Sequence, residues 1–373
     1  MKNLFDTTTI NGMELRNRFV RSATWEGMCD EHGRPTARLS ECYSALAAGN
    51  VGLIITGYAY VRPDGKQMIG SIGAYTDDLA LEMKQVAAAV HREGGKLCLQ
   101  LVHCGGQARA QDGRKNIAPS AIETPQYSSV PAEMGIKDIE EIIAAFGAAA
   151  RRARDWGFDA VQLHAAHGYL INQFLSPHTN RRTDAYGGSV ENRTRFLLEV
   201  YRKVRSMVGP QYPVLVKLNG SDFLPNGLTL DDAVHAAQAL DAGGIDAIEV
   251  SGGTPASGDQ VPVRTKIERP EQEAYNLPLA ARIKSTVNCP VMVVGGFRSF
   301  EIVRDVIAKG QADHVSLARP FVREPGLVKR WEAGDTARAR CISCNGCFKP
   351  GMREGGIACV IERIEQKNKG LSL

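Results

Sequence analysis

Eight short apolar segments, each followed by a longer amphipathic stretch, constrain the fold of this chain more than any other feature. These segments are Phe19–Arg21, Leu53–Thr56, Leu97–Leu101, Ala160–Leu163, Val214–Leu218, Ala247–Val250, Val291–Val294 and His314–Leu317. The run Val-Met-Val-Val at 291–294 is apolar at successive positions rather than at every second one. This pattern is typical of parallel strands that are buried on both faces.

The stretches between these segments have the length and apolar spacing of helices. They are Arg38–Ala48, Asp77–Arg92, Ile136–Asp155, Val190–Met207, Leu230–Ala242, Leu277–Thr286, Ser299–Ala308 and one near Glu324–Trp331. Eight βα units in one chain predict an α/β fold of the (β/α)8 TIM-barrel type. A doubly wound parallel sheet is the alternative fold. No G-x-G-x-x-G motif follows a predicted strand, so a separate dinucleotide-binding domain is disfavoured.

The two ends of the chain differ from this repeating pattern. Residues 8–15 are predicted to form an N-terminal hairpin that turns at Asn11-Gly12. Residues 332–373 are rich in Cys and Gly and end in a charged stretch. We therefore expect a barrel over residues 1–331 and a Cys-rich C-terminal extension over residues 332–373 that packs on the barrel.

Composition excludes several classes of partner. The chain has 45 Lys and Arg against 41 Asp and Glu, a formal net charge of +4, which gives no basic excess for binding nucleic acid. No run approaches the ~18 apolar residues of a membrane span, and the N-terminus lacks the apolar core of a signal peptide. The expected location is the cytoplasm, where the nine cysteines would be thiols or metal ligands rather than disulfides.

The residues at the carboxyl ends of the predicted strands are the candidates for function, because a TIM barrel places its active site there. They are Ser22, Ala23, Thr24, Trp25, Tyr58, Gln100, His164, His167, Tyr169, Lys217, Gly295, Gly296, Ala318 and Arg319. The aromatic side chains among them could be core residues or the wall of a planar cofactor, and the sequence alone leaves both open.

The last two strand ends indicate a phosphate site. Gly295 and Gly296 would let the backbone approach an anion, and Arg319 would supply a bidentate cation. Taken singly, the glycines could make only a tight turn and Arg319 could pair with a surface carboxylate. Their occurrence at adjacent strand ends favours the phosphate.

The segment after the fourth strand suggests acid–base chemistry. His164 and His167 can together hold one oxygen atom and stabilise negative charge that develops on it. Tyr169 lies two residues further on and is a candidate proton donor. A metal site is the weaker alternative, because no carboxylate is near these histidines in the sequence.

The same segment carries a specific resemblance. The run from His164 to Ser189, which reads HAAHGYLINQFLSPHTNRRTDAYGGS, and Glu191-Asn192-Arg193 closely resemble the old yellow enzyme family of FMN-dependent ene-reductases. The resemblance extends from residue 3 to about residue 330 and includes Asn17-Arg18, Gln100-Leu101 and Ser221-Asp222.

The resemblance implies a barrel that holds FMN over its strand ends. His164 and His167 would hold the substrate's carbonyl oxygen, and Tyr169 would be the catalytic acid. Gln100 would contact the pyrimidine edge of the flavin. The other flavin contacts would come from Ser22, Ala23, Thr24, Tyr58 and Lys217, and the phosphate would lie at Gly295, Gly296, Ala318 and Arg319.

Two positions depart from the family pattern. Lys217 stands where the family usually has Arg near flavin N1, which keeps the charge but loses the planar fork. The segment Ser22–Trp25 replaces the commoner Pro-x-Thr or Pro-x-Cys, so the sequence leaves open whether Thr24 or Trp25 meets flavin O4.

Four cysteines gather in the C-terminal extension: Cys341, Cys344, Cys347 and Cys359. They resemble the cysteine cluster of the branch that includes 2,4-dienoyl-CoA reductase and trimethylamine dehydrogenase, which implies a 4Fe–4S cluster. Three closely spaced cysteines and a distant fourth suit a cubane, whereas zinc sites tend to use two separated Cys-x-x-Cys pairs. Zinc and an empty thiol site remain the alternatives.

The sequence thus predicts a flavoenzyme that reduces an activated C=C bond in an α,β-unsaturated carbonyl compound or an enoyl thioester. The electron donor would be NADH, NADPH or a ferredoxin-like protein that acts through the cluster. The alternatives are oxidative amine demethylation, a flavin-free lyase with a Schiff base on Lys217, and a non-enzymatic redox sensor or electron carrier. A homo-oligomer is left open.

Overall fold

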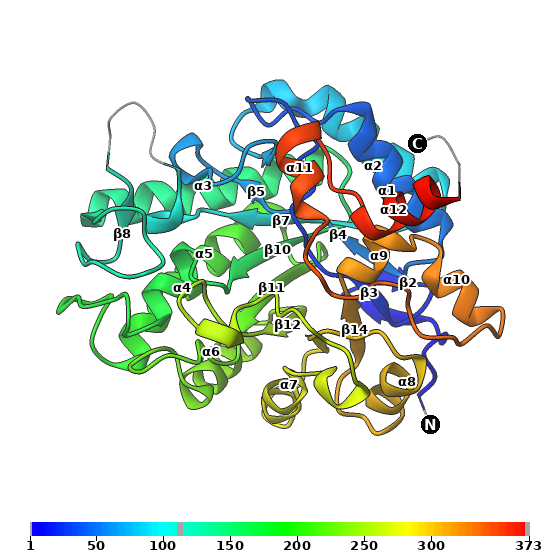
Figure 1. Ribbon diagram of the computed structural model, residues 1–373. Coiled ribbons are helices and arrows are strands. Elements are labelled where there is room, and N and C mark those ends of the chain that lie inside the picture. Colours follow the sequence, from blue (N-terminus) through cyan, green and yellow to red (C-terminus); the bar gives the residue numbers. More distant parts are fainter. Residues whose placement is uncertain (1, 110–114, 370–373) are drawn as a thin grey trace.

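A closed barrel of eight parallel strands forms the centre of the computed structural model, which describes residues 2–109 and 115–369 (Figure 1). The strands are β3 (Phe19–Arg21), β4 (Leu53–Ile55), β7 (Leu97–Val102), β10 (Ala160–Ala165), β11 (Val214–Asn219), β12 (Ala247–Ser251), β13 (Val291–Val294) and β14 (His314–Leu317). They pair in that order, and β14 pairs back with β3. The predicted (β/α)8 barrel is therefore confirmed.

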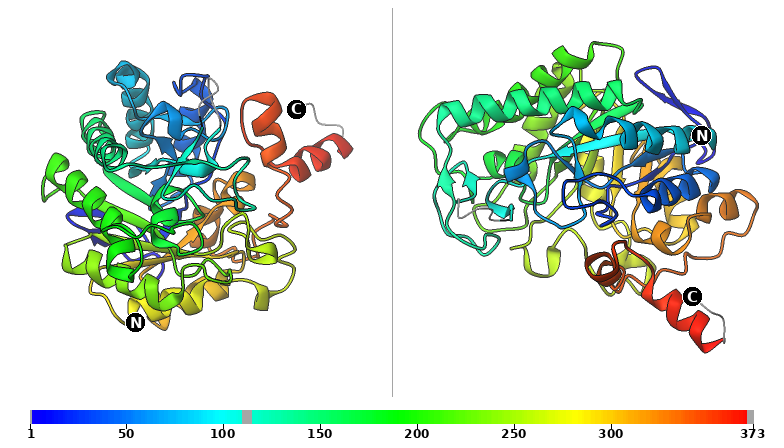
Figure 2. Two further views of the ribbon diagram at one scale, coloured as in Figure 1. Left: turned by 90° about the vertical axis from the view of Figure 1, so that its left-hand side faces the viewer. Right: turned by 90° about the horizontal axis from the view of Figure 1, so that it is seen from above.

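Helices surround the barrel, as the two views of Figure 2 show. The helices are α1 (Ala37–Ala48), α2 (Ala80–Arg92), α3 (Ile136–Asp155), α4 (Leu170–Leu175), α5 (Val190–Val208), α6 (Leu230–Ala242), α7 (Leu277–Lys284), α8 (Phe300–Ala308), α9 (Arg319–Arg323), α10 (Leu327–Glu332), α11 (Phe348–Glu354) and α12 (Val360–Asn368). In α3 the buried side chains Ile139, Ile142 and Phe146 recur every three or four residues, so one stripe of the helix faces the sheet. The sequence analysis did not predict the helices α4, α9, α11 and α12, of which α4, α9 and α11 have at most two turns.

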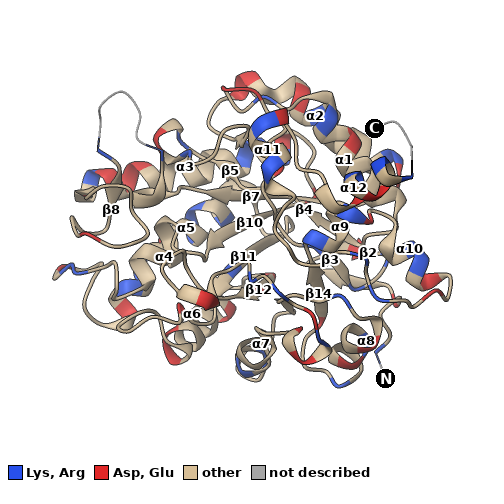
Figure 3. Ribbon diagram, viewed as in Figure 1, with Lys and Arg blue, Asp and Glu red and all other residues tan. Residues whose placement is uncertain are grey.

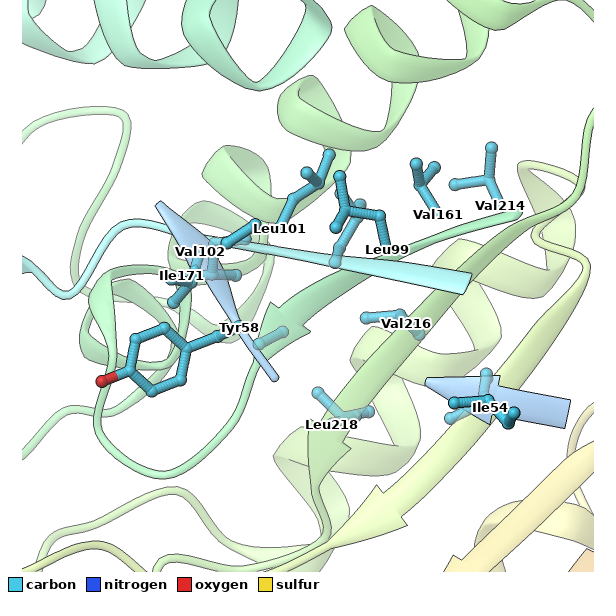
Figure 4. Packing of buried hydrophobic residues seen from close by; sticks show 14 of the residues in the cluster. Ile54, Tyr58, Leu99, Leu101, Val102, Val161, Ile171, Val214, Val216 and Leu218 are labelled. Atoms are coloured by element: carbon cyan, nitrogen blue, oxygen red, sulfur yellow. The ribbon is translucent and has the colours of Figure 1, made fainter. Parts of the chain in front are cut away.

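Alternation along the strands divides their side chains between two layers. Leu99, Leu101 and Val161 belong to the outer layer, where they pack between the strands and the helices (Figure 4). Cys98 and Ala160 point the other way, into the barrel, and belong to a separate apolar cluster. Both faces of the barrel strands are buried except at Val294, which is partly buried at the end of β13, and this burial explains the continuously apolar runs.

The N-terminal hairpin closes one end of the barrel. It consists of β1 (Thr8–Ile10) and β2 (Met13–Leu15), joined at Asn11 (φ 42°) and Gly12 (φ 77°), so the predicted Asn-Gly turn is confirmed. The buried side chains of the hairpin belong to the same apolar cluster as strand residues that point into the barrel, such as Leu53 and Ala160. The opposite end, where the strands terminate, is left for function.

Four short strands lie outside the eight-stranded barrel order. They are β5 (Ala59–Tyr60), β6 (Ile72–Gly73), β8 (Ile117–Ala118) and β9 (Ala132–Glu133). The first two extend from β7, and the last two pair with each other in the segment between β7 and α3. These strands belong to loops that rise above the carboxyl ends of the barrel strands.

The C-terminal extension lies beside α1 and α9 (Figures 1 and 2). Arg38 of α1 donates to the carbonyl oxygen of Glu354 at 2.8 Å, and Arg323 of α9 forms an ion pair with Glu365 of α12 at 2.6 Å. The Trp25 and Phe348 rings stack with centroids 6.3 Å apart. The extension thus contacts both the helical layer and the segment that follows β3.

The outer surface carries both signs of charge. In the view of Figure 3, Lys and Arg alternate with Asp and Glu over the helices rather than separating into two faces. Of the described helices, none combines the length and the apolar character that a membrane span requires.

Candidate active site

A pocket opens at the carboxyl ends of the barrel strands, and it spans about 1030 Å³ when the space open to solvent is included. All of the predicted flavin and catalytic residues line it except Gly295, namely Ser22, Ala23, Thr24, Tyr58, Gln100, His164, His167, Tyr169, Lys217, Gly296, Ala318 and Arg319. The barrel therefore brings together residues that are separated by up to almost 300 positions in the sequence, and all eight strand ends contribute.

Gly295 and Gly296 have different surroundings. Gly296 has φ +75° and lines the pocket, and a Cβ there would lie 2.8 Å from the Tyr275 ring. A Cβ on Gly295 would instead lie 3.0 Å from the backbone nitrogen of Asn276. Gly295 thus lets α7 approach β13 closely, and only Gly296 faces the pocket.

Three rings converge at the end of β10. The His164 and His167 ring centroids are 5.1 Å apart, and the His164 and Tyr169 centroids are 4.8 Å apart, both in edge-to-face geometry. His167 has φ 61° and Gly168 has φ 74°, so the chain turns sharply after the strand. This turn places the two imidazoles side by side and brings Tyr169 next to them.

Hydrogen bonds define which ring nitrogen of each histidine is free. Nδ1 of His164 accepts from the backbone N–H of Ala166 at 3.3 Å, so the neutral ring carries its proton on Nε2. Nε2 of His167 lies 2.7 Å from the Ser251 hydroxyl. Burial, His167 and Lys217 hold the pKa of His164 well below its usual value, and burial and Lys217 do the same for His167. Both imidazoles are therefore neutral, and the His164 ring can donate through its Nε2–H.

Tyr169 is held as a protonated phenol. Its hydroxyl donates to Oε1 of Gln67 at 2.8 Å, and its ring lies 5.6 Å from that of Tyr58. Burial and the neighbouring Tyr58 raise the pKa of Tyr169 well above the ordinary value. The proton remains available for donation throughout the neutral range.

The floor of the pocket is polar. Lys217 Nζ donates to Ser22 Oγ at 2.7 Å and lies 3.1 Å from Glu249 Oε2. Gln162 Nε2 donates to the same carboxylate oxygen at 3.0 Å, and Gln100 Nε2 donates to Gln162 Oε1 at 2.7 Å. Burial would raise the pKa of Glu249, but Lys217 and these hydrogen bonds hold it below the ordinary value. Lys217 is therefore an ion-paired side chain.

Arg319 joins the pocket to the C-terminal extension. Its Nη1 donates to Asn345 Oδ1 at 2.6 Å and to the carbonyl oxygen of Ser343 at 3.2 Å. Trp25 also contacts the extension, because its ring stacks on that of Phe348. Its indole N–H donates to the carbonyl oxygen of Ile69 at 2.9 Å. The extension thus supplies part of the wall of the pocket.

Several lining residues escaped the sequence interpretation. Ser251 and Ser316 lie at strand ends, so their positions gave a signal that was not used. Tyr275 enters from the loop before α7, and Ser343 and Phe348 enter from the extension. These three lie outside any strand end, so the strand-end rule could not find them.

The four clustered cysteines line a second, smaller pocket, which spans about 300 Å³ when the space open to solvent is included. Its other described lining residues are Arg319, Val322, Ile342, Asn345, Val360 and Ile361. Cys344 is exposed, and burial raises the pKa of Cys347 to about 11. Within residues 2–109 and 115–369, no three His, Cys, Asp or Glu side chains are grouped closely enough to hold a metal ion. The metal-site prediction therefore stays a prediction.

Comparison with known proteins identifies relatives over the whole barrel. The model of the NADH:flavin oxidoreductase / NADH oxidase family matches residues 3–337. The chain is 38% identical to an NADH oxidase of Thermoanaerobacter brockii over 351 residues, which is 93% of this chain and 53% of that protein. The chain thus spans about half the length of this curated relative.

The chain is also similar to solved structures, among them a reductase complex and an old yellow enzyme homologue. A complex of 2-naphthoyl-CoA reductase with 2-naphthoyl-CoA matches with a TM-score of 0.89 and 28% identity, over 96% of this chain and 56% of that one. An old yellow enzyme homologue from Zymomonas mobilis matches with a TM-score of 0.79 and 26% identity, over 94% and 98% of the two chains.

Proposed function

The chain belongs to the NADH:flavin oxidoreductase / NADH oxidase family, which includes the old yellow enzymes; from this premise we propose that it is an FMN-dependent oxidoreductase and that it reduces activated C=C bonds. The substrate class is an α,β-unsaturated carbonyl compound or an enoyl thioester. A flavin-free lyase is not retained, because the family is flavin-dependent and Lys217 is paired with Glu249.

The residues of the pocket suit FMN. Gln100 and Lys217 offer polar contacts on the floor, and Arg319 offers a cation for the phosphate beside Gly296 and Ala318. The buried hydroxyl of Ser316 also lines the pocket and has no hydrogen-bond partner within the described residues. A polar ligand would satisfy such a buried group.

The chemistry is divided between the cofactor and the chain. When bound, FMN supplies the hydride that adds to the β-carbon, and NADH or NADPH would reduce the flavin again. Nε2–H of His164 and the His167 ring donate to the carbonyl oxygen, where negative charge develops as the β-carbon is attacked. Tyr169 then gives its phenolic proton to the α-carbon.

The observation that carries this proposal is the trio of converging rings. Two neutral imidazoles that donate hydrogen bonds match a carbonyl oxygen better than an amine nitrogen, so we do not propose oxidative demethylation. The 2-naphthoyl-CoA reductase similarity supports a thioester as the carbonyl group. The test is anaerobic reduction with NADH and with NADPH, followed by reoxidation with enones, enoyl-CoA thioesters and amines. Reoxidation by amines alone would contradict the proposal.

We expect Arg319→Ala to bind FMN about 10- to 100-fold more weakly, because a charge-assisted contact with the phosphate is lost. The measurement is fluorescence titration of the apoprotein with FMN. Arg323→Ala is the matched control, since Arg323 lies on the same helix but pairs with Glu365 outside the pocket. Equal FMN affinity in Arg319→Ala and the wild type would remove the phosphate assignment.

We also propose that Cys341, Cys344, Cys347 and Cys359 hold a 4Fe–4S cluster in a unit that begins near residue 332 and packs on the FMN-binding barrel of residues 1–331. All four thiols line one pocket, and its described lining contains neither a carboxylate nor an imidazole. Thiolates are the ligands of such clusters. A cluster beside Arg319 would lie close to the flavin and could accept electrons from a ferredoxin-like protein.

We expect anaerobically purified protein to contain about four irons per chain, with broad absorption under the flavin bands. Cys344→Ala should lose this iron, whereas Cys289→Ala should keep it, because Cys289 does not line the cysteine pocket. The iron content is measured by metal analysis, and the cluster by its absorption spectrum. One zinc and no iron from an iron-replete preparation would show the zinc alternative to be the right one.

A further inference from the structure

A buried glutamate lies directly behind the flavin pocket without lining it. Glu249 is in the middle of β12, its side chain is fully buried, and it is absent from the described pocket lining. It pairs in register with Lys217 of β11, so the two side chains enter the barrel interior at the same level. A buried carboxylate is costly to retain unless it is paired, and here it is paired with a pocket residue.

One carboxylate oxygen supports both predicted flavin contacts on the floor. Oε2 of Glu249 lies 3.1 Å from Lys217 Nζ and accepts from Gln162 Nε2 at 3.0 Å. Because an ionised carboxylate only accepts, Gln162 must turn its Oε1 toward Gln100, which donates to it at 2.7 Å. Glu249 therefore acts on Lys217 directly and on Gln100 through Gln162.

The floor carries no net charge. Lys217 contributes one positive charge and Glu249 one negative charge, at an N–O distance of 3.1 Å. The imidazoles of His164 and His167 are neutral, because burial and Lys217 lower the pKa of each. The buried Cys98 thiol, on the neighbouring side of the interior, also stays neutral, because burial and Glu249 raise its pKa. Lys217 is thus a compensated cation rather than a free one.

We propose that Glu249 is a positioning residue that lowers the redox potential of bound FMN by neutralising Lys217. This inference rests on the proposed function, in that FMN would be held in the pocket that Lys217 lines. Reduction by hydride adds one negative charge to the flavin, and an uncompensated cation at the floor would stabilise that charge strongly. The carboxylate offsets this stabilisation, so the reduced flavin is a stronger hydride donor. A strong donor suits thioesters, which are weaker electrophiles than ketones.

The test is potentiometric titration of the holoenzyme and its variants with redox dyes. In Glu249→Gln we expect reduced FMN to be bound about tenfold more tightly relative to oxidised FMN, which raises the potential by ~30 mV for a two-electron couple. Lys217→Gln removes the cation, and burial then raises the pKa of the unpaired Glu249 carboxyl, so the floor again carries no net charge and the ratio should stay near the wild-type value. The double variant, which again has no net charge, should return toward the wild type.

A control separates charge from packing. The Thr56 hydroxyl accepts from the Gln100 backbone N–H at 3.2 Å but contacts neither member of the ion pair. Thr56→Val should therefore disturb the packing of the same floor. The affinity for reduced FMN relative to oxidised FMN should nevertheless stay within about threefold of the wild-type ratio. An unchanged or lowered potential in folded, flavin-loaded Glu249→Gln overturns the proposal.

Failure of a variant to fold and failure of the proposed function can each be told apart from failure of this inference. If Glu249→Gln fails to fold, Glu249→Ala removes the same charge without placing an amide in the interior. Its potential must then lie above that of the wild type, and an equal or lower potential overturns the proposal. Enone and enoyl-CoA turnover is measured separately on the wild type. Its absence would refute C=C reduction, while the shifts in potential would still support the role of Glu249.

Discussion

Replacing both His164 and His167 by alanine is expected to slow enone reduction by about 100-fold or more. In the proposed mechanism the two imidazoles donate to the oxygen on which negative charge develops, and one such donor alone is typically worth about 100- to 1000-fold. Reduction of the flavin by NADH or NADPH should be slowed much less, because that step develops no oxyanion. Stopped-flow measurement of the two half-reactions separates these effects.

Ligand binding gives an independent check on the histidine pair. Phenols that bind over the flavin with a charge-transfer band should lose this band in the double variant, because their oxygen loses both donors. His314→Ala is a matched control, since His314 is a buried histidine of β14 that does not line the pocket. If the double variant keeps wild-type enone turnover, the oxygen-binding role is refuted.

The histidine pair also predicts a pH profile. Burial and Lys217 hold the pKa of both imidazoles well below their usual value, so both rings should stay neutral at a pH where an exposed histidine is already charged. The enone half-reaction should therefore show no step near pH 6.5, where an exposed histidine would titrate. A step at that pH that disappears in the double variant would show that one ring titrates normally.

The barrel was predictable because the signal for each strand is local. Every predicted strand segment overlaps an observed strand, since continuous burial in a parallel barrel requires continuous apolar runs. Closure of the barrel then brings the strand ends together. This is why Gln100, His164 and Lys217 meet in one pocket although the sequence separates them widely.

The remainder of the site depends on tertiary register, which the sequence does not reveal. Glu249 interrupts the predicted strand Ala247–Val250, and only the pairing of β11 with β12 shows that it meets Lys217. Ser343 and Phe348 reach the pocket because the extension folds back along α9, a path that no periodic pattern encodes. Gly295 was placed in the cradle by its position in a Gly-Gly pair, but its close neighbour is the backbone before α7.

Tyr169→Phe is expected to slow the enone half-reaction by about 100-fold or more and to leave flavin reduction nearly unchanged. A positioned general acid typically contributes about 100- to 10,000-fold, and only the α-carbon needs the phenolic proton. The raised pKa of Tyr169, caused by burial and Tyr58, keeps this proton in place across the neutral range, so the defect should be the same from pH 6 to pH 8.

The change removes one oxygen atom from a buried ring, and Tyr60→Phe makes the same change outside the pocket, where the Tyr60 ring stacks on Tyr75 at 5.3 Å. Tyr60→Phe should therefore leave both half-reactions intact. A solvent deuterium isotope effect on the enone half-reaction, present in the wild type and altered in Tyr169→Phe, would locate the proton transfer at this residue. If Tyr169→Phe slows both half-reactions equally, the hydroxyl acts through its hydrogen bond to Gln67, which orders the loop above the pocket, rather than as the acid.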